Sequence, residues 1–230
     1  MAEPTIVAMG GLSWDEAERR RLEDYVFGLT GRKRPRVLVV PTAVADDFEA
    51  TLRLFTQIGD RAQVSYLPFF PWPPSDLRQL ALEQDAIYVT GGNTANALAI
   101  WRTHGFDEVL RDAWEAGVVL AGWSAGMLCW FESAVTDSFG PELKGMRDGL
   151  GFLPGSACPH YDGEPERRPV YCKLVAEGFP PGLAADDCVA LRFEGTELVE
   201  TISVRAGARA YRVTASGEEP IEPRLLLSGP

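Results

Sequence analysis

Short apolar runs alternate with amphipathic stretches over most of the 230-residue chain. The apolar runs are rich in β-branched residues, which is typical of short strands buried on both faces. In the intervening stretches the apolar residues recur at helical spacing. The predicted strands are residues 5–9, 36–40, 64–67, 85–89 and 118–121. The predicted helices are residues 14–27, 48–58, 75–84, 95–101, 106–115 and 166–177.

This alternation of strands and helices predicts an α/β fold. A mostly parallel sheet then lies between helices on both faces, which gives three layers. After residue 188 the helical period gives way to alternating strands at 189–193, 198–204 and 208–213, which predict a C-terminal antiparallel β extension. Because no internal repeat or long linker interrupts the pattern, we expect one domain that spans residues 1–230.

The most informative stretch follows the strand at 118–121. It reads Gly122-Trp123-Ser124-Ala125-Gly126 and continues into the apolar residues 127–131, which predict the start of a helix. A serine between two glycines at a strand-to-helix corner is the nucleophile-elbow pattern. The corner strains the backbone and packs strand against helix so closely that a Cβ at either flank would clash. The alternative is an ordinary glycine-rich turn whose serine caps the helix.

A nucleophilic serine needs a base, and the chain has only two histidines. His104 precedes a glycine at a predicted helix end, where histidines commonly serve as caps. His160 lies within the predicted strand end at 157–161, where a loop begins. Because sites in parallel α/β sheets form at the carboxyl ends of strands, His160 is the better candidate. A histidine that is merely hydrogen-bonded in a loop is the alternative.

Backbone N–H groups and a carboxylate would complete such a site. The N–H of Ala125 is one candidate donor for an oxyanion, and the Gly91-Gly92 turn offers others. A phosphate-binding loop is a weak alternative for that turn, since no Gly-Lys-Ser/Thr ending follows. Several carboxylates could orient the histidine: Asp137, Asp162, Glu164, Asp186 and Asp187. The Asp186-Asp187 pair lies between apolar segments, so at least one of the two needs a partner.

Composition narrows the alternatives. The net charge of −11 argues against a nucleic-acid partner, and no apolar run reaches the length of a membrane span. Four cysteines without C-x-x-C spacing and an N-terminus without a signal-peptide pattern predict reduced thiols in a cytoplasmic protein. Two distant histidines with scattered carboxylates provide no metal-ligand set. We therefore expect neither a metal nor a cofactor.

Taken together, these motifs resemble the peptidase E family of serine peptidases, whose relatives include the cyanophycinases. The resemblance rests on the Thr90–Thr94 turn, the Gly122–Gly126 elbow, the Pro159-His160 strand end and residues 185–191. It implies a fold similar to class I glutamine amidotransferases, which is flavodoxin-like.

The resemblance also implies roles for individual residues. Ser124 is then the nucleophile, His160 the base and Asp187 the acid, with Asp137 as the second candidate for the acid. The turn that carries Gly91, Gly92 and Asn93 would form the oxyanion and substrate-binding region together with Ala125.

The implied activity is cleavage of small peptides, specifically dipeptides with an N-terminal aspartate, through an acyl-enzyme on Ser124. The substrate carboxylate then requires a donor, and the basic residues near the site are candidates: Arg147, Arg167, Arg168 and Lys173. A non-catalytic homologue that binds a small ligand and a hydrolase of another amide are the alternatives. The expected partner is a small peptide. The sequence does not determine the oligomeric state, and a homodimer is one of the options.

Overall fold

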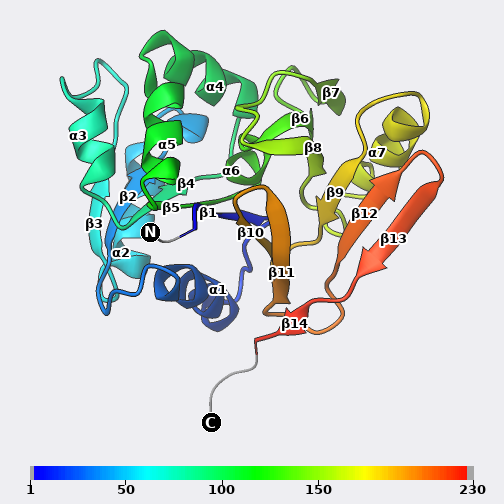
Figure 1. The fold of residues 1–230 in the computed structure, drawn as a ribbon, viewed down its shortest axis with the longest axis horizontal. Helices are drawn as coiled ribbons and strands as arrows, with labels where there is room; N and C mark the ends of the chain where they lie inside the picture. The colour runs from blue at the N-terminus through cyan, green and yellow to red at the C-terminus, as the bar shows by residue number, and fades with distance from the viewer. Residues whose placement is uncertain (1–2, 227–230) are drawn as a thin grey trace.

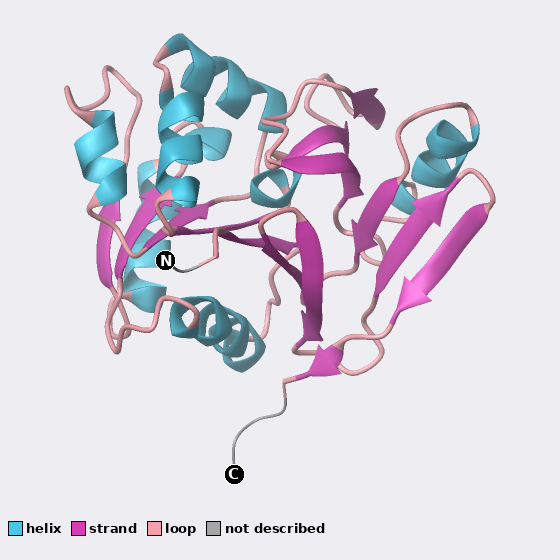
Figure 2. Cartoon of the chain, in the orientation of Figure 1, coloured by secondary structure: helices cyan, strands magenta, loops and turns pink. Residues whose placement is uncertain are grey.

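The computed structural model describes residues 3–226, which form an α/β fold with two β-sheets (Figures 1 and 2). In this part of the chain the first sheet has eight strands in the order β14-β11-β10-β1-β5-β4-β2-β3. Its strands are β1 (Thr5–Met9), β2 (Arg36–Val40), β3 (Gln63–Tyr66), β4 (Ala86–Val89), β5 (Val119–Trp123), β10 (Val189–Glu194), β11 (Glu197–Ser203) and β14 (Arg224–Leu225).

The half of this sheet that runs from β1 to β3 is parallel throughout, and β10 pairs with β1 in the antiparallel sense. β11 then pairs antiparallel with β10. This arrangement confirms the predicted parallel core and its antiparallel C-terminal extension. Because the five parallel strands point the same way, their carboxyl ends lie along one edge of the sheet.

Helices cover both faces of the first sheet. They are α1 (Glu16–Gly28), α2 (Phe48–Ile58), α3 (Leu77–Leu82), α4 (Thr94–Thr103) and α5 (Phe106–Glu115), with a short 3₁₀ turn, η1 (Thr42–Val44), after β2. Successive residues of a strand face opposite ways. In β1, Val7 and Met9 pack with α1 and α2, whereas Ile6 and Ala8 pack with α3, α4 and α5. All four side chains are fully buried, which explains the uninterrupted apolar run.

A second sheet, which the sequence patterns do not predict, lies beside the first (Figure 1). Within residues 3–226 it has six strands in the order β13-β12-β9-β8-β6-β7. They are β6 (Phe131–Thr136), β7 (Lys144–Met146), β8 (Leu153–Cys158), β9 (Gly182–Ala185), β12 (Ala210–Thr214) and β13 (Gly217–Ile221), and α7 (Arg167–Ala176) packs against them.

The helix predicted after the elbow is wrong beyond its first turn. Helix α6 (Ala125–Leu128) is a single turn, and the chain enters β6 at Phe131. β6 pairs with β7 and β8, so its backbone hydrogen bonds depend on segments far along the chain. An apolar run of this length does not distinguish a buried helix from a buried strand, and here the tertiary pairing decided.

Most other boundaries confirm the predicted elements to within a few residues. Asp47 is the N-cap of α2, and its carboxylate accepts the N–H of Ala50. At α1 the N-cap is Asp15, whose side chain accepts the N–H of Glu18, and the Ser13 hydroxyl donates to Glu18 Oε2. Among the described residues, no helix combines the length and apolarity that a membrane-spanning segment requires.

Candidate active site

A groove of about 510 Å³ opens at the carboxyl edge of the first sheet. Its walls come from the segments after β1, β2, β4 and β5, from one face of α2, and from the loop after β8. The lining residues are Leu12, Trp14, Val44, Ala50, Arg53, Leu54, Gln57, Thr90, Gly91, Gly92, Trp123, Ser124 and His160. Residues widely separated in the sequence therefore meet where a parallel sheet places functional groups.

Ser124 occupies the corner between β5 and α6. Its backbone has φ 55° and ψ −111°, an energetically unfavourable conformation for a residue with a Cβ. The N–H of Ser124 donates to the carbonyl of Met9, which continues the pairing of β5 with β1. The side chain makes no capping hydrogen bond to α6. The hydroxyl therefore lines the groove without serving the helix, and the helix-cap alternative loses its support.

The two glycines of the elbow make this corner possible. A Cβ on Gly122 would lie 2.6 Å from the carbonyl oxygen of Val89 in β4, and a Cβ on Gly126 would overlap the same atom. Both positions therefore require the close approach that only glycine allows. This is the steric reason for the Gly-x-Ser-x-Gly pattern in this chain.

His160 reaches the groove from the loop after β8. Its backbone has φ 51°, and its N–H donates to the carbonyl of Gly10. The imidazole Nδ1 lies 2.7 Å from Asp187 Oδ1. Because that hydrogen bond occupies Nδ1, Nε2 is the ring nitrogen left for a reacting group. The sequence-predicted Ser124, His160 and Asp187 thus converge: two line the groove, and the third contacts the histidine.

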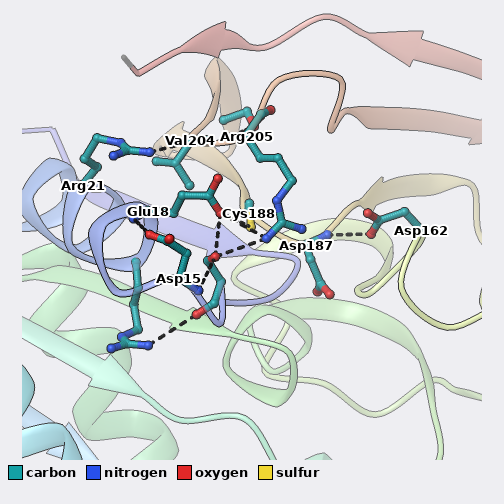
Figure 3. A network of polar contacts seen from close by, with 11 residues as sticks. Asp15, Glu18, Arg21, Asp162, Asp187, Cys188, Val204 and Arg205 are labelled. Atoms are coloured by element: carbon teal, nitrogen blue, oxygen red, sulfur yellow. Dashed lines mark hydrogen bonds and ion pairs between the residues drawn. The ribbon is translucent and has the colours of Figure 1, made fainter. Parts of the chain in front are cut away.

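Hydrogen bonds on both sides of Asp187 fix its backbone. Its backbone N–H donates to Asp162 Oδ1 over 2.8 Å, as Figure 3 shows. On its other side the next residue, Cys188, lies beside a network in which Arg205 donates to Glu18 and Ser13. These contacts join the loop at the end of β9 to α1 and fix the main chain that carries the carboxylate.

The loop that carries His160 is also anchored to the C-terminal hairpin. The Tyr161 hydroxyl donates to Glu218 Oε2 in β13 over 2.7 Å. Burial, reinforced by the hydrogen bonds to Cys172 and Glu218, raises the pKa of the Tyr161 phenol, so the hydroxyl stays a donor. Strand β13 therefore contributes to the position of a residue nearly sixty positions earlier in the chain.

The candidate oxyanion donors lie in two different turns. Gly92 has φ 130°, and a Cβ there would collide with the carbonyl of Ala43. Among residues 3–226, the N–H groups of Gly92 and Ala125 have no protein acceptor. Gly91 lines the groove, and a Cβ at this position would point toward Trp123 and Ser124. Asn93 lies farther away: it is the N-cap of α4, accepting from Asn96 N–H and donating to Ser138 O.

The other carboxylates and the other histidine lie elsewhere. Asp137 is more than half exposed, with Arg167 as its ion-pair partner at 3.9 Å. Asp186 accepts the N–H of Arg209. His104 is the exposed C-cap of α4, as its position before a glycine indicates. Of the candidate carboxylates, Asp187 is the one that contacts the His160 imidazole within the described residues, whereas Glu164 meets His160 through its backbone N–H and bonds Arg167 with its carboxylate.

The model of peptidase family S51 matches residues 6–201, a span that includes Ser124, His160 and Asp187. The chain belongs to peptidase family S51. It is a serine-type peptidase, as the motifs predict.

Individual relatives agree with the family assignment. An uncharacterized peptidase of Bacillus subtilis (strain 168), YgaJ, is 46% identical over 220 residues, which are 94% of this chain and 95% of that protein. The crystal structure of a peptidase from an acI-B1 actinobacterium has a TM-score of 0.69 at 16% identity and covers 96% of this chain and 95% of that one. A putative peptidase E protein from Listeria monocytogenes EGD-e has a TM-score of 0.66 at 19% identity, with coverages of 89% and 100%. The two structures confirm the fold.

Gly11 is a residue of this S51 peptidase that the sequence analysis overlooked as part of the site. It follows β1 and pairs with Asp187, and its carbonyl accepts the N–H of Cys188 over 2.9 Å. A Cβ on Gly11 would overlap Asp187 Oδ1 and lie 2.8 Å from His160 Nδ1. The glycine pair that ends the first strand was the available signal, but its partner is visible only in the folded chain.

Gly11→Ala is therefore expected to separate His160 from Asp187. A displacement of about 1 Å in such a contact lowers kcat/KM by about 100-fold. The measurement is kcat/KM together with the melting temperature. Gly28→Ala is the matched control, because a Cβ there meets no atom within 4 Å. Wild-type kcat/KM in folded Gly11→Ala would contradict the proposed close packing.

Asp186 provides a pH-dependent test of the same region. Burial raises the pKa of its carboxyl to about 6, although Oδ2 accepts the Arg209 N–H over 2.8 Å. The folded state then holds the proton more tightly than the unfolded state, so stability is full at low pH and falls as pH rises through about 4 to 7. Relative to Asp186→Asn, the wild type should lose about 2–3 kcal/mol of unfolding free energy over that range. Denaturant unfolding at each pH measures it, and parallel curves for the two proteins would contradict it.

The basic residues expected to bind a substrate carboxylate do not line the groove. Arg167 is buried and bonded to Glu164, and Arg168 pairs with Glu218. Arg147 lies over the Phe179 ring, and Lys173 lies near Glu177. The cation that does line the groove is Arg53 of α2, which the sequence analysis did not single out. Nothing in the local pattern distinguishes it from other exposed helix arginines.

The two cysteines beside this site, Cys158 and Cys188, are not suited to act as the nucleophile. Cys158 lies two residues before His160, but it is buried, and burial raises the pKa of its thiol to about 12. Burial likewise raises the pKa of Cys188 to about 11. Both remain protonated thiols near neutral pH and lack the thiolate character of a nucleophile. Within residues 3–226, no group of three or more His, Cys, Asp or Glu side chains is placed to hold a metal ion.

Proposed function

We propose that this peptidase hydrolyses short peptides through an acyl-enzyme formed on Ser124. One observation carries the proposal: Ser124 and His160 line the same groove, and the far side of the imidazole is bonded to Asp187. That order of nucleophile, base and orienting acid is the arrangement that nucleophilic catalysis by serine requires.

The reaction follows from these positions. Nε2 of His160 takes the proton of the Ser124 hydroxyl as Oγ attacks the scissile carbonyl carbon. The N–H groups of Gly92 and Ala125 stabilise the oxyanion of the tetrahedral intermediate. The imidazolium then gives its proton to the leaving amine, which departs and leaves the acyl ester. Water, deprotonated by His160, hydrolyses that ester and restores the hydroxyl.

Asp187 acts on His160 and does not touch the substrate. Its carboxylate accepts the Nδ1 proton, which keeps the imidazole in the tautomer whose Nε2 can accept a proton from Ser124. It also stabilises the positive imidazolium that forms after proton transfer.

The groove itself indicates the size of the substrate. Its volume of about 510 Å³ suits a small ligand, and much of its wall is apolar, including Leu12, Val44 and Leu54. Dipeptides with an N-terminal aspartate are the substrates that the resemblance to peptidase E implies, and we propose them as the preferred substrates.

The test is covalent labelling of the wild-type protein with a serine-directed phosphonate, followed by peptide mapping. The proposal predicts one modified peptide that contains Ser124, and a burst of product with an activated ester. The unfolded protein is the control, because labelling should require the assembled site. Modification at another residue, or no modification, would contradict the proposal and favour a ligand-binding homologue.

A panel of dipeptides that differ in the first residue tests the substrate class. The proposal predicts turnover of short peptides with the largest kcat/KM for an N-terminal aspartate. Equal turnover of all members would reject the aspartate preference, and cleavage of other amides alone would indicate a hydrolase of different specificity.

A further inference from the structure

The charge of the groove differs from the charge of the protein. The chain carries 33 aspartate and glutamate residues and a net charge of −11, yet none of the described residues that line the groove has a carboxylate. Among the lining residues that the structure describes, Arg53 is the one with a permanent positive charge. A substrate ammonium would find no counter-charge on these walls, whereas a substrate carboxylate would find one. The groove is therefore suited to an anionic ligand.

Arg53 belongs to the face of α2 that forms one wall. Residues 50, 53, 54 and 57 recur at the spacing of one helix face, and all four line the groove. Within residues 3–226, the Arg53 guanidinium has no carboxylate within 4 Å and no hydrogen bond to another protein group. The Gln57 side-chain amide, one turn farther along, has no protein partner in the same region either.

The chemistry of these two side chains matches a carboxylate. A guanidinium presents a planar pair of N–H donors that fits both carboxylate oxygens, and an amide N–H beside it adds a further donor. Arg147, Arg167, Arg168 and Lys173 lie outside the groove. On the basis of the proposed peptidase function, we propose that Arg53, assisted by Gln57, binds a carboxylate of the peptide substrate and selects anionic peptides.

A short peptide offers two such carboxylates. One is the side chain of an acidic residue before the scissile bond, and the other is the C-terminal carboxylate of the leaving residue. Both present the same chemistry to Arg53, so the peptides used in the test separate them. Aspartyl-leucine, asparaginyl-leucine and the C-terminal amides of both form a set in which each carboxylate is neutralised independently.

The experiment measures kcat/KM for these four peptides. It also measures how well each peptide protects Ser124 from labelling by a neutral phosphonate, because this protection reports binding even without turnover. It compares the wild type, Arg53→Met and Arg53→Lys. Arg212→Met is the matched control, because Arg212 is also exposed, has no ion pair in the described region and lies on β12 away from the groove.

Arg53→Met should lower kcat/KM by about 10- to 100-fold for peptides that carry the recognised carboxylate, and leave their neutral counterparts nearly unchanged. Loss of the aspartyl-over-asparaginyl preference identifies the side-chain carboxylate, and loss of the acid-over-amide preference identifies the C-terminal one. Arg53→Lys should retain part of the preference, since it keeps the charge but not the planar fork. Arg212→Met should behave as the wild type.

Unchanged preferences in Arg53→Met would overturn the inference. Labelling of Ser124 by the neutral phosphonate at the wild-type rate shows that the variant is folded, so an unchanged preference in a labelled variant concerns Arg53 alone. A wild-type protein that is not labelled at Ser124 would instead overturn the proposed function, and the role of Arg53 with it.

Discussion

Replacement of Ser124 by alanine is expected to lower kcat/KM for peptides by about 10³- to 10⁶-fold, the range over which removal of a catalytic serine acts. The variant retains the groove, the His160–Asp187 pair and the oxyanion donors, but it has no atom that can form the acyl bond. Phosphonate labelling should disappear as well. Peptide binding, measured by calorimetry, should persist, because most of the groove wall is unchanged.

The fold should tolerate this change. Among residues 3–226 the Ser124 hydroxyl has no hydrogen bond that its loss would break, and alanine keeps the Cβ at a position whose φ is 55° in either case. The unfolding free energy should therefore move by no more than about 0.5 kcal/mol. Ser216→Ala, in the exposed turn between β12 and β13, is the matched control and should keep full activity. Labelling of Ser124→Ala at the wild-type rate would show that another residue is the nucleophile.

Replacement of Asp187 by asparagine is expected to lower kcat by about 10⁴-fold. An asparagine amide can donate a hydrogen bond to Nδ1, which leaves the proton on Nε2, where Ser124 needs an acceptor. The imidazolium also loses its counter-charge. Because Asp187 does not line the groove, KM should change far less than kcat. Steady-state kinetics that separate kcat from KM give the measurement.

Asp137→Asn is the control that discriminates between the two candidate acids. Asp137 is more than half exposed and forms an ion pair with Arg167 at 3.9 Å, so its neutralisation should leave kcat within about twofold of the wild type. The opposite result, with kcat lost in Asp137→Asn and retained in Asp187→Asn, would transfer the role of the acid to Asp137 and require a rearranged site during turnover.

Three residues at this site have positive φ although none is glycine: Ser124, His160 and Cys188. Each such conformation costs about 1–3 kcal/mol, and it persists only where the surrounding structure fixes it. Here the fixing contacts are the hydrogen bonds of Ser124 N–H to Met9, of His160 N–H to Gly10 and of Cys188 N–H to Gly11. The end of β1 thus holds all three strained residues, although it contributes no reacting group.

The parallel strands, the elbow and the catalytic candidate His160 could be predicted from local sequence. The parallel strands are identifiable because both of their faces are buried, which requires continuous apolar runs. The elbow is identifiable because its glycines and serine form a five-residue pattern, although the steric requirement behind the glycines comes from Val89 in β4. His160 could be singled out because histidine is scarce in the chain and because it lies at a predicted strand end. In each case the signal itself lies within a short stretch of the sequence.

The rest was decided by tertiary structure. Residues 131–136 form a strand because β7 and β8 supply its hydrogen bonds. Gly11 and Arg53 lie at the site because β1 ends beside it and one face of α2 forms a wall of the groove, which no local pattern records. Asp186 and Asp187 are adjacent in sequence, yet one accepts the Arg209 N–H and the other contacts His160. Neighbouring side chains of an extended segment point in opposite directions, so only the packing of that segment shows which carboxylate meets the histidine.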